Sequence, residues 1–311
     1  MFIDSLNLRN FRNYRDCTVE FSPGSNYIVG KNGAGKTNIL ESIAVLSTLR
    51  SFRSASDRDC IMHGEGAYYC RAEICECEQR IFEVACFINE GKLLRRMKID
   101  GSEVKRAPEY FGHLLSVTVS PDDLSIVTGV PEHRRRFFDS LISKIDRDYL
   151  STLVRFRKVL SERNGLLKSI REGRTANLQE VSVWNTMIAD FSSIIIKKRL
   201  EVLSLFETDF YESYRRISDF EEPPEIRYKN TATSLNRDEI IENLERRIDK
   251  DIAAATTTIG PHRDEYEIIG KSNVRFQDCS SQGQKRTASI CIKMAEKRLV
   301  ERISKKKLLF S

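Results

Sequence analysis

A glycine-rich segment constrains the fold more than any other feature of this sequence: Gly30-Lys31-Asn32-Gly33-Ala34-Gly35-Lys36-Thr37. It fits the phosphate-binding pattern G-x-x-x-x-G-K-[ST], which occurs between a strand and a helix. The apolar run at residues 26–29 predicts the strand before it. The helix after it is predicted by apolar residues on one face, which are Ile39, Leu40, Ile43, Ala44 and Leu46. We therefore expect an α/β fold whose backbone amides cradle phosphate oxygens.

Two side chains of this P-loop carry specific chemistry. The Lys36 ammonium is placed to neutralise the β- and γ-phosphates, and the Thr37 hydroxyl is placed to hold Mg²⁺. The dipole of the following helix adds to the attraction for anions. We predict ATP and Mg²⁺ as cofactors, with Thr37 as the metal-binding side chain and no catalytic residue assigned.

Changes in the sequence pattern predict that the chain has three parts. Residues 1–125 form the first part of an ATPase lobe, and an antiparallel meander is expected over residues 67–104. Residues 126–250 are helical and charged, and form a separate lobe inserted into the ATPase. Residues 251–311 return to short motifs and form an incomplete second part of the ATPase lobe.

Within the helical lobe, one apolar stripe has an average spacing of 3.5 residues, the period of a coiled coil. An ordinary helical bundle fits equally well at this point. The stripe consists of Ile196, Leu200, Leu203, Phe206, Phe210, Tyr214 and Ile217.

The composition sets broad limits on function. The formal net charge is 51 − 45 = +6, which permits a nucleic-acid partner without demonstrating one. No apolar run is long enough to cross a bilayer, and the first residues lack the layout of a secretory signal. We expect a cytoplasmic protein with no membrane association.

A second short motif, Ser281-Gln282-Gly283-Gln284, leaves two interpretations open. Either Ser280 or Ser281 caps the helix that follows, or Ser281, Gly283 and Gln284 form a second phosphate site. Because the P-loop already covers one side of a nucleotide, such a site would serve the nucleotide of a partner subunit.

These motifs together resemble the SMC-type branch of ABC ATPases and, within it, the RecF family of bacterial recombination mediators. The resemblance covers nearly the whole chain. It runs through residues 6–14, the P-loop, 51–53, 120–124, 134–139, 163–167, 260–264 and 281–284.

The resemblance implies an ABC-type P-loop ATPase head, with a mixed sheet and a flanking antiparallel meander, that carries a helical insertion lobe. It implies an ATP-dependent homodimer that grips duplex DNA near single-strand gaps and helps RecO and RecR load recombinase. Lys36 and Thr37 would bind the nucleotide in cis, while Ser281 and Gly283 would contact it from the partner. Arg12 and Asn13 would lie near the nucleotide.

The chain departs from the family pattern at its last residues. Residues 305–311 look like the start of the Walker B strand, which in the family ends in two acidic residues. We therefore expect the weak ATPase activity of the family to be impaired in this chain, which looks truncated. We also expect backbone groups of the P-loop strand to lack a neighbouring strand.

Other functions fit the sequence less well. A nucleotide-binding subunit of a transporter has a similar P-loop, but the helical insertion and residues 11–14 argue against it. A P-loop kinase gives residues 281–284 no role, and only the last residues support a non-functional remnant. Candidate DNA contacts are Arg50, Arg53, Arg58 and residues 197–199, whereas residues 134–136 read as a solvated helix face and His262 as part of a structural turn.

Overall fold

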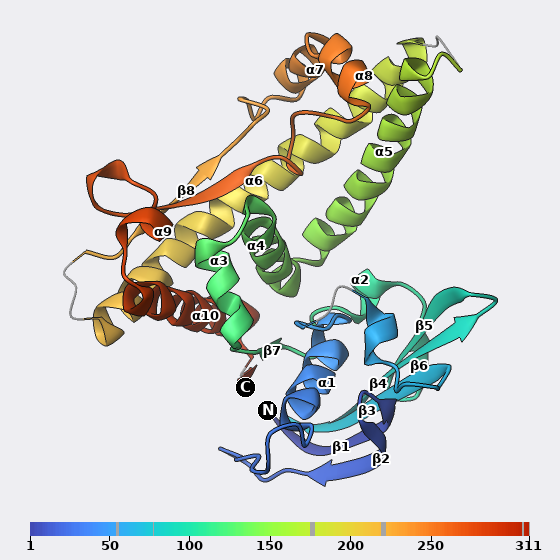
Figure 1. Cartoon of the computed structure of the whole chain (residues 1–311), viewed down its shortest axis with the longest axis vertical. Coiled ribbons are helices and arrows are strands. Elements are labelled where there is room, and N and C mark those ends of the chain that lie inside the picture. The colour runs from blue at the N-terminus through green and yellow to red at the C-terminus, as the bar shows by residue number, and fades with distance from the viewer. Residues whose placement is uncertain (54–55, 77, 175–177, 219–221, 307, 311) are drawn as a thin grey trace. The chain divides into compact units, whose positions relative to one another are not determined.

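A computed structural model describes residues 1–53, 56–76, 78–174, 178–218, 222–306 and 308–310 (Figure 1). The chain divides into two compact units. Unit 1 comprises Met1–Asp122 and Val300–Ser311, and unit 2 comprises Asp123–Leu299. The three functional parts predicted from the sequence differ from this division and stay a proposal.

Unit 1 is built on a six-stranded antiparallel sheet with the order β2-β1-β3-β4-β5-β6. The strands are β1 (Phe2–Phe11), β2 (Tyr14–Glu20), β3 (Ala67–Cys75), β4 (Gln79–Asn89), β5 (Lys92–Ile99) and β6 (Ser102–Val104). The meander predicted over residues 67–104 corresponds to β3 to β6. Unit 1 also contains helices α1 (Lys36–Thr48) and α2 (Ala107–Tyr110), and a parallel pair of short strands, β7 (Ser116–Val117) and β10 (Leu309–Phe310).

The core of unit 1 fixes helix α1 on one face of the sheet. Alternate residues of β1 and β3 point inward, because successive side chains of a strand face opposite ways. Ile39, Ile43 and Leu46 of α1 belong to the same buried cluster as these strand residues. Since the P-loop immediately precedes α1, this packing sets the position of the loop relative to the sheet.

The strand predicted at residues 26–29 is not formed, and that prediction was wrong. Tyr27 and Val29 are 89% and 90% exposed. A strand needs partners for its N–H and C=O groups, and no strand of the described chain pairs with this segment. Residues 305–311 were predicted to begin a strand, and Leu309–Phe310 of this segment form the short strand β10. Lys307 and Ser311 lie outside the described residues.

Unit 2 is mainly helical, with one two-stranded antiparallel sheet. Its elements are α3 (Leu124–Thr128), α4 (Pro131–Ile145), α5 (Arg147–Arg171), α6 (Leu178–Ile217), β8 (Glu225–Lys229), α7 (Arg237–Glu245), α8 (Ile248–Ala254), β9 (Glu265–Ile269), α9 (Phe276–Cys279) and α10 (Gln282–Ser304), whose last turn belongs to unit 1. Short 3-10 turns occur at Asp57–Cys60, Pro121–Asp123 and Lys271–Asn273.

The long helix α6 packs as part of a bundle rather than as one strand of a coiled coil. It contacts α5, α7, α4 and β8. Leu200 and Ile217 of the predicted stripe are exposed, whereas Phe206 and Phe210 between them are buried. Because α6 has several neighbours, its buried face is wider than the narrow seam of a two-stranded coiled coil.

A buried ion pair links helices α5 and α8 within unit 2. Arg163 of α5 is 0% exposed and donates to Asp251 of α8 at 2.8 Å and to Thr257 at 2.7 Å. Asn185 of α6 accepts a third hydrogen bond from Arg163, at 2.8 Å. These contacts join segments that are far apart in the chain.

Candidate nucleotide-binding site

The P-loop turns sharply into helix α1, and two of its glycines make the turn possible. Gly33 and Gly35 have φ angles of 81° and 98°, the left-handed region that favours glycine. A Cβ atom on Gly35 would also lie 2.7 Å from the Asn13 side chain. Another residue at position 35 would therefore strain both the backbone and its neighbours.

The Lys36 side chain folds back along the loop. Its Nζ donates to the carbonyl oxygens of Gly30 at 2.7 Å and Lys31 at 2.8 Å. These two bonds hold the ammonium over the loop and leave a donor direction for a phosphate oxygen. Thr37, the predicted Mg²⁺ ligand, is exposed at the same end of the helix.

The N-terminal end of α1 is open to an anion. Among the described residues no side chain caps it, and its first turn contains no acidic residue. The first N–H groups of a helix have no partners within the helix, and the helix dipole favours negative charge there. The open helix end and the absence of acidic residues in its first turn therefore leave room for a negatively charged group at the loop.

Three side chains beside the loop lie outside its glycine-rich motif. Asn13 follows the end of β1, and its Nδ2 lies 3.3 Å from the Ala34 carbonyl oxygen. The Tyr14 hydroxyl lies 3.5 Å from the same oxygen, and Asn38 Nδ2 donates to Asn13 Oδ1 at 2.8 Å. The turn between β1 and β2 therefore contacts the loop directly, which the spacing of the motif alone does not predict.

A buried carboxylate lies one turn further along α1. Glu41 is 0% exposed and accepts hydrogen bonds from Arg12 at 2.5 and 3.0 Å and from Ser51 at 2.5 Å. Arg53 lies 3.6 Å from Glu41 and donates to Asn38 at 2.7 Å. Partial burial works against the charge on Arg12, yet the Glu41 hydrogen bonds and charge raise the pKa of Arg12 above its usual value.

The second motif forms the start of helix α10. The Gln284 backbone N–H donates to the Ser281 hydroxyl at 3.2 Å, and the Ser281 N–H donates to the Gln284 side chain at 2.7 Å. This reciprocal pair is a capping box. The capping interpretation with Ser281 is therefore confirmed, while contact with a partner's nucleotide stays a prediction. Ser281 and Gly283 are exposed.

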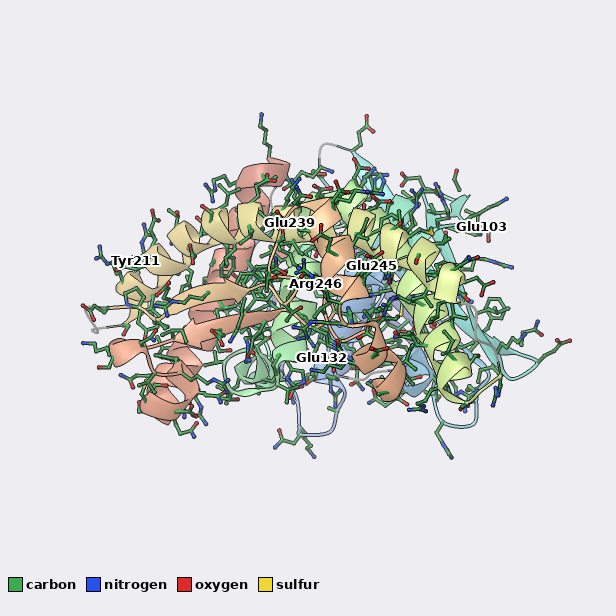
Figure 2. All side chains as sticks on the ribbon, turned by 90° about the horizontal axis from the view of Figure 1, so that it is seen from above. Glu103, Glu132, Tyr211, Glu239, Glu245 and Arg246 are labelled. Atoms are coloured by element: carbon green, nitrogen blue, oxygen red, sulfur yellow. The ribbon has the colours of Figure 1, made fainter. Side chains whose placement is uncertain are left out.

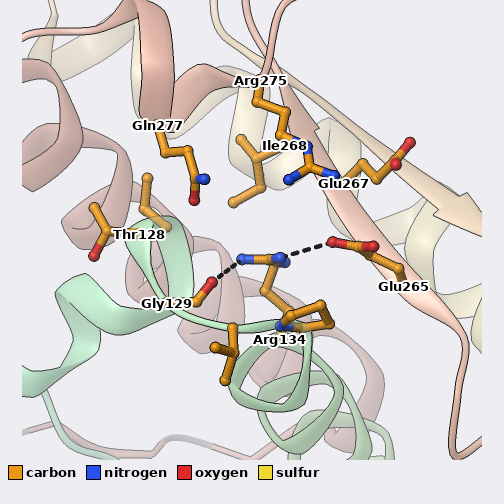
Figure 3. A pocket seen from close by; sticks show the side chains of 11 residues that line it. Thr128, Gly129, Arg134, Glu265, Glu267, Ile268, Arg275 and Gln277 are labelled. Atoms are coloured by element: carbon orange, nitrogen blue, oxygen red, sulfur yellow. Dashed lines mark hydrogen bonds and ion pairs between the residues drawn. The ribbon is translucent and has the colours of Figure 1, made fainter.

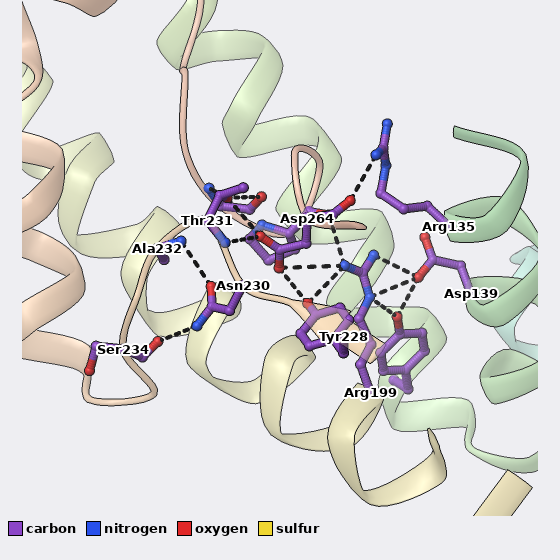
Figure 4. A network of polar contacts seen from close by, with 12 residues as sticks. Arg135, Asp139, Arg199, Tyr228, Asn230, Thr231, Ala232, Ser234 and Asp264 are labelled. Carbon is purple, nitrogen blue, oxygen red and sulfur yellow. Dashed lines mark hydrogen bonds and ion pairs between the residues drawn. The ribbon is translucent and has the colours of Figure 1, made fainter. Parts of the chain in front are cut away.

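Two of the basic residues considered from the sequence have structural roles instead. Arg199 is 1% exposed and donates to Asp139 at 2.8 Å and to the Pro261 carbonyl at 2.8 Å (Figure 4). It cannot reach a DNA phosphate, so that prediction was wrong. Arg134 is also buried, between Gly129 and Glu265, and does not belong to a solvated helix face. Alternating burial along a helix cannot be read from a run of basic residues alone.

A small cavity of about 280 Å³ lies beside Arg134 within unit 2 (Figure 3). Arg134 and Arg275 line it together with Glu265 and Glu267. Charges of both signs therefore face the cavity, and Arg134 pairs with Glu265 at 2.9 Å. This balance gives the cavity no preference for an anion such as a phosphate.

The Gly-Pro-His-Arg-Asp segment, residues 260–264, makes buried polar contacts within unit 2. Asp264 is buried and accepts from the Thr231 backbone and hydroxyl, both at 2.7 Å, and from the Tyr228 hydroxyl. His262 Nε2 lies 2.9 Å from the Thr257 carbonyl oxygen. Burial lowers the pKa of His262 to about 4. His262 is therefore neutral at pH 7 and contributes to the turn.

We expect His262 to make unit 2 less stable in mild acid. Its pKa is lower in the folded than in the unfolded chain, so only the unfolded chain gains a proton as the pH falls from about 6.5 towards 4. Because His262 as a residue is only partly buried, the loss between pH 7.5 and 5 should be on the order of 1 kcal/mol. Urea unfolding at both pH values checks this, with His262→Gln as the comparison. An equal pH dependence in both proteins would contradict it.

The described residues contain neither a membrane-spanning helix nor a cluster of metal ligands. No helix among them has both the length and the apolar character that crossing a membrane requires. No group of three His, Cys, Asp or Glu side chains among them could hold a metal ion.

The chain is similar to known proteins over nearly its whole length. A family model described as an AAA ATPase domain matches residues 1–308. The protein "DNA replication and repair protein RecF" of Thermoanaerobacter sp. (strain X514) is 36% identical over 315 residues, covering 99% of this chain and 85% of that protein. The protein of the same name from Ligilactobacillus salivarius (strain UCC118) is 34% identical over 304 residues, covering 95% and 79%.

Solved structures match as well. The structure described as the recombination mediator protein RecF-ATP in the RecFOR pathway has a TM-score of 0.93 and 30% identity, covering 99% of this chain and 83% of that one. The corresponding RecF-ATPrS structure has a TM-score of 0.90 and 31% identity, covering 99% and 84%. The predicted ABC-type ATPase head with a helical insertion is thereby confirmed as the fold.

Proposed function

This chain belongs to the RecF family of DNA replication and repair proteins, and from that premise we propose that it is an ATP-dependent, DNA-binding recombination mediator. The observation that carries the proposal is the P-loop itself. Gly33 and Gly35 adopt the left-handed conformations that the turn requires, and Lys36 is held over the loop by two carbonyl oxygens. The similarity covers 95–99% of the chain in these relatives, the helical unit included, so a transporter subunit is not favoured.

ATP is the nucleotide we propose. Backbone amides from Gly30 to Gly35 and the start of α1 would surround its phosphates, with Lys36 beside the β- and γ-phosphates. The Thr37 hydroxyl would hold Mg²⁺, which neutralises charge on the phosphates. The exposed, uncapped helix end supports this assignment.

The second motif acts across a homodimer in our proposal. Ser281, Gly283 and Gln284 lie at the exposed start of a 23-residue helix, where an anion is favoured by the helix dipole. Their own capping box holds the Ser281 hydroxyl in place. ATP bound by one subunit would therefore be covered by α10 of the other.

Dimerisation would create the DNA-binding surface. We propose that duplex DNA near single-strand gaps is held mainly through its phosphates, without reading of sequence. Exposed cations such as Arg50 and Lys197 remain candidates for these contacts. RecO and RecR are the partners we propose by family membership, in loading recombinase on gapped DNA.

We expect Ser281→Arg to remove the increase in duplex-DNA affinity that ATP produces. The added side chain would block closure of the dimer on the nucleotide while leaving the P-loop of the same subunit intact. Fluorescence anisotropy with labelled duplex DNA, with and without ATP, measures the increase, and sedimentation measures the dimer. Ser182→Arg, on an exposed position of α6, adds the same charge as a control. A full ATP response in Ser281→Arg would rule out the role of this motif.

A further inference from the structure

The turn between β1 and β2 carries an unusual backbone conformation. Only Arg12 and Asn13 separate the paired residues Phe11 and Tyr14. Arg12 has a φ of 55°, in the left-handed region where glycine is the usual residue of such a hairpin. A non-glycine residue persists in this conformation only when its surroundings hold it there.

The surroundings that hold Arg12 come from three directions. Its backbone N–H donates to the Cys60 carbonyl at 2.8 Å, and its NH1 donates to the Asp59 carbonyl at 2.5 Å. Its Nε and NH2 donate to both oxygens of Glu41. A guanidinium paired with both oxygens of a carboxylate has a fixed orientation as well as a fixed position.

The placement of Glu41 connects this pair to the P-loop. Glu41 lies in helix α1, whose first turn continues directly from the loop. The turn that Arg12 belongs to places Asn13 and Tyr14 against Ala34 and Gly35. The P-loop is therefore linked to Arg12 in two ways. One link passes through α1 and Glu41, and the other passes through Asn13, which follows Arg12 in the turn.

We propose that Glu41 is a positioning residue for nucleotide binding: through Arg12 it fixes the β1–β2 turn against Ala34 and Gly35 and keeps the P-loop in its phosphate-binding conformation. Glu41 does not itself contact the phosphates, because it is wholly buried. This inference rests on the proposed ATP binding and is independent of DNA binding.

Whether loss of the Glu41 charge raises or lowers the affinity for ATP distinguishes positioning from simple electrostatic repulsion. A carboxylate near a phosphate site repels the ligand, so removal of its charge alone raises the affinity for ATP. Loss of positioning lowers the affinity instead, because the turn is no longer held against the loop. Glu41→Gln preserves the size of the side chain and therefore tests the two effects against each other.

We expect Glu41→Gln to weaken ATP binding about tenfold in isothermal titration calorimetry, equivalent to about 1.4 kcal/mol. Glu103→Gln is the matched control, since Glu103 projects from β6 of the same unit into solvent (Figure 2) and should leave the affinity unchanged. An unchanged or raised affinity in Glu41→Gln would overturn the proposal. Absence of ATP binding by the unmodified protein would instead refute the proposed function.

A double-mutant cycle distinguishes positioning from a general loss of stability. Asn13→Ala removes the contact that the Asn13 side chain makes with Ala34. If Glu41 acts through the turn, the combined variant should lose less affinity than the sum of the two single losses. If the two losses of ATP affinity were additive, Glu41 would not act through the turn. Should Glu41→Gln unfold, Arg12→Gly serves instead, because it relieves the left-handed backbone yet should still weaken ATP binding; unchanged affinity in that variant would overturn the proposal.

Discussion

The Lys36→Met variant should bind ATP about 100-fold more weakly than the unmodified protein, because it loses a charged hydrogen-bond donor that contributes about 1.5–3 kcal/mol. In the structure the Lys36 ammonium is already held over the loop by the Gly30 and Lys31 carbonyl oxygens. Little rearrangement is therefore needed when a phosphate arrives. Methionine keeps an unbranched apolar side chain of nearly the same length but leaves those two carbonyl oxygens without this donor.

Calorimetric titration with ATP measures this effect. Lys92→Met is the control, since Lys92 is an exposed lysine at the start of β5 and its loss changes the net charge equally. Chelation of Mg²⁺ should weaken ATP binding in the unmodified protein. Without Mg²⁺, the negative charge on the phosphates of ATP would be neutralised by the P-loop alone. Equal ATP affinities in Lys36→Met and Lys92→Met would contradict the assignment of the P-loop.

The Arg163→Met variant should lower the free energy of unfolding by about 3–5 kcal/mol, the cost of leaving a buried charge without its partner. Arg163 is wholly buried and pairs with Asp251, which is also wholly buried. Removal of the arginine leaves the buried Asp251 carboxylate without its ion-pair partner. The substitution also removes the hydrogen bonds from Arg163 to Asn185 and Thr257. The polar contacts through which Arg163 links α5 to α6, α8 and Thr257 would be lost together.

Arg157→Met on the same helix provides the comparison. Arg157 is about half exposed and lies 3.5 Å from Asp139, so its loss should cost less than about 1 kcal/mol. Urea unfolding followed by circular dichroism measures both variants. If Arg157→Met were as destabilising as Arg163→Met, the buried pair would not have the structural role we assign to it.

The P-loop and the helix after it could be predicted from sequence because their signals are local. The glycine spacing fixes the turn, and the apolar face of residues 39–46 fixes the helix that follows. The strand predicted at residues 26–29 shows the limit of such signals. An apolar run suits a strand, but a strand also requires partners, and those come from elsewhere in the chain.

The roles of single charged residues could not be predicted for the same reason. Arg199 and Lys198 are adjacent in a basic run, yet Arg199 is buried against Asp139 and Pro261 while Lys198 pairs with Asp146 and Glu201. Glu41 gave no signal, because its importance depends on Arg12, Ser51 and Arg53, which approach it only in the fold. The capping role of Ser281 was predictable, since its partner Gln284 is three residues away.

The central claim is that ATP held by the P-loop controls the binding of duplex DNA. The most direct test measures the affinity of the unmodified protein for a labelled duplex, with and without ATP and Mg²⁺, in the same buffer and at the same salt concentration. We predict tighter binding with ATP. Equal affinities under both conditions, in a protein that calorimetry shows to bind ATP, would contradict the account.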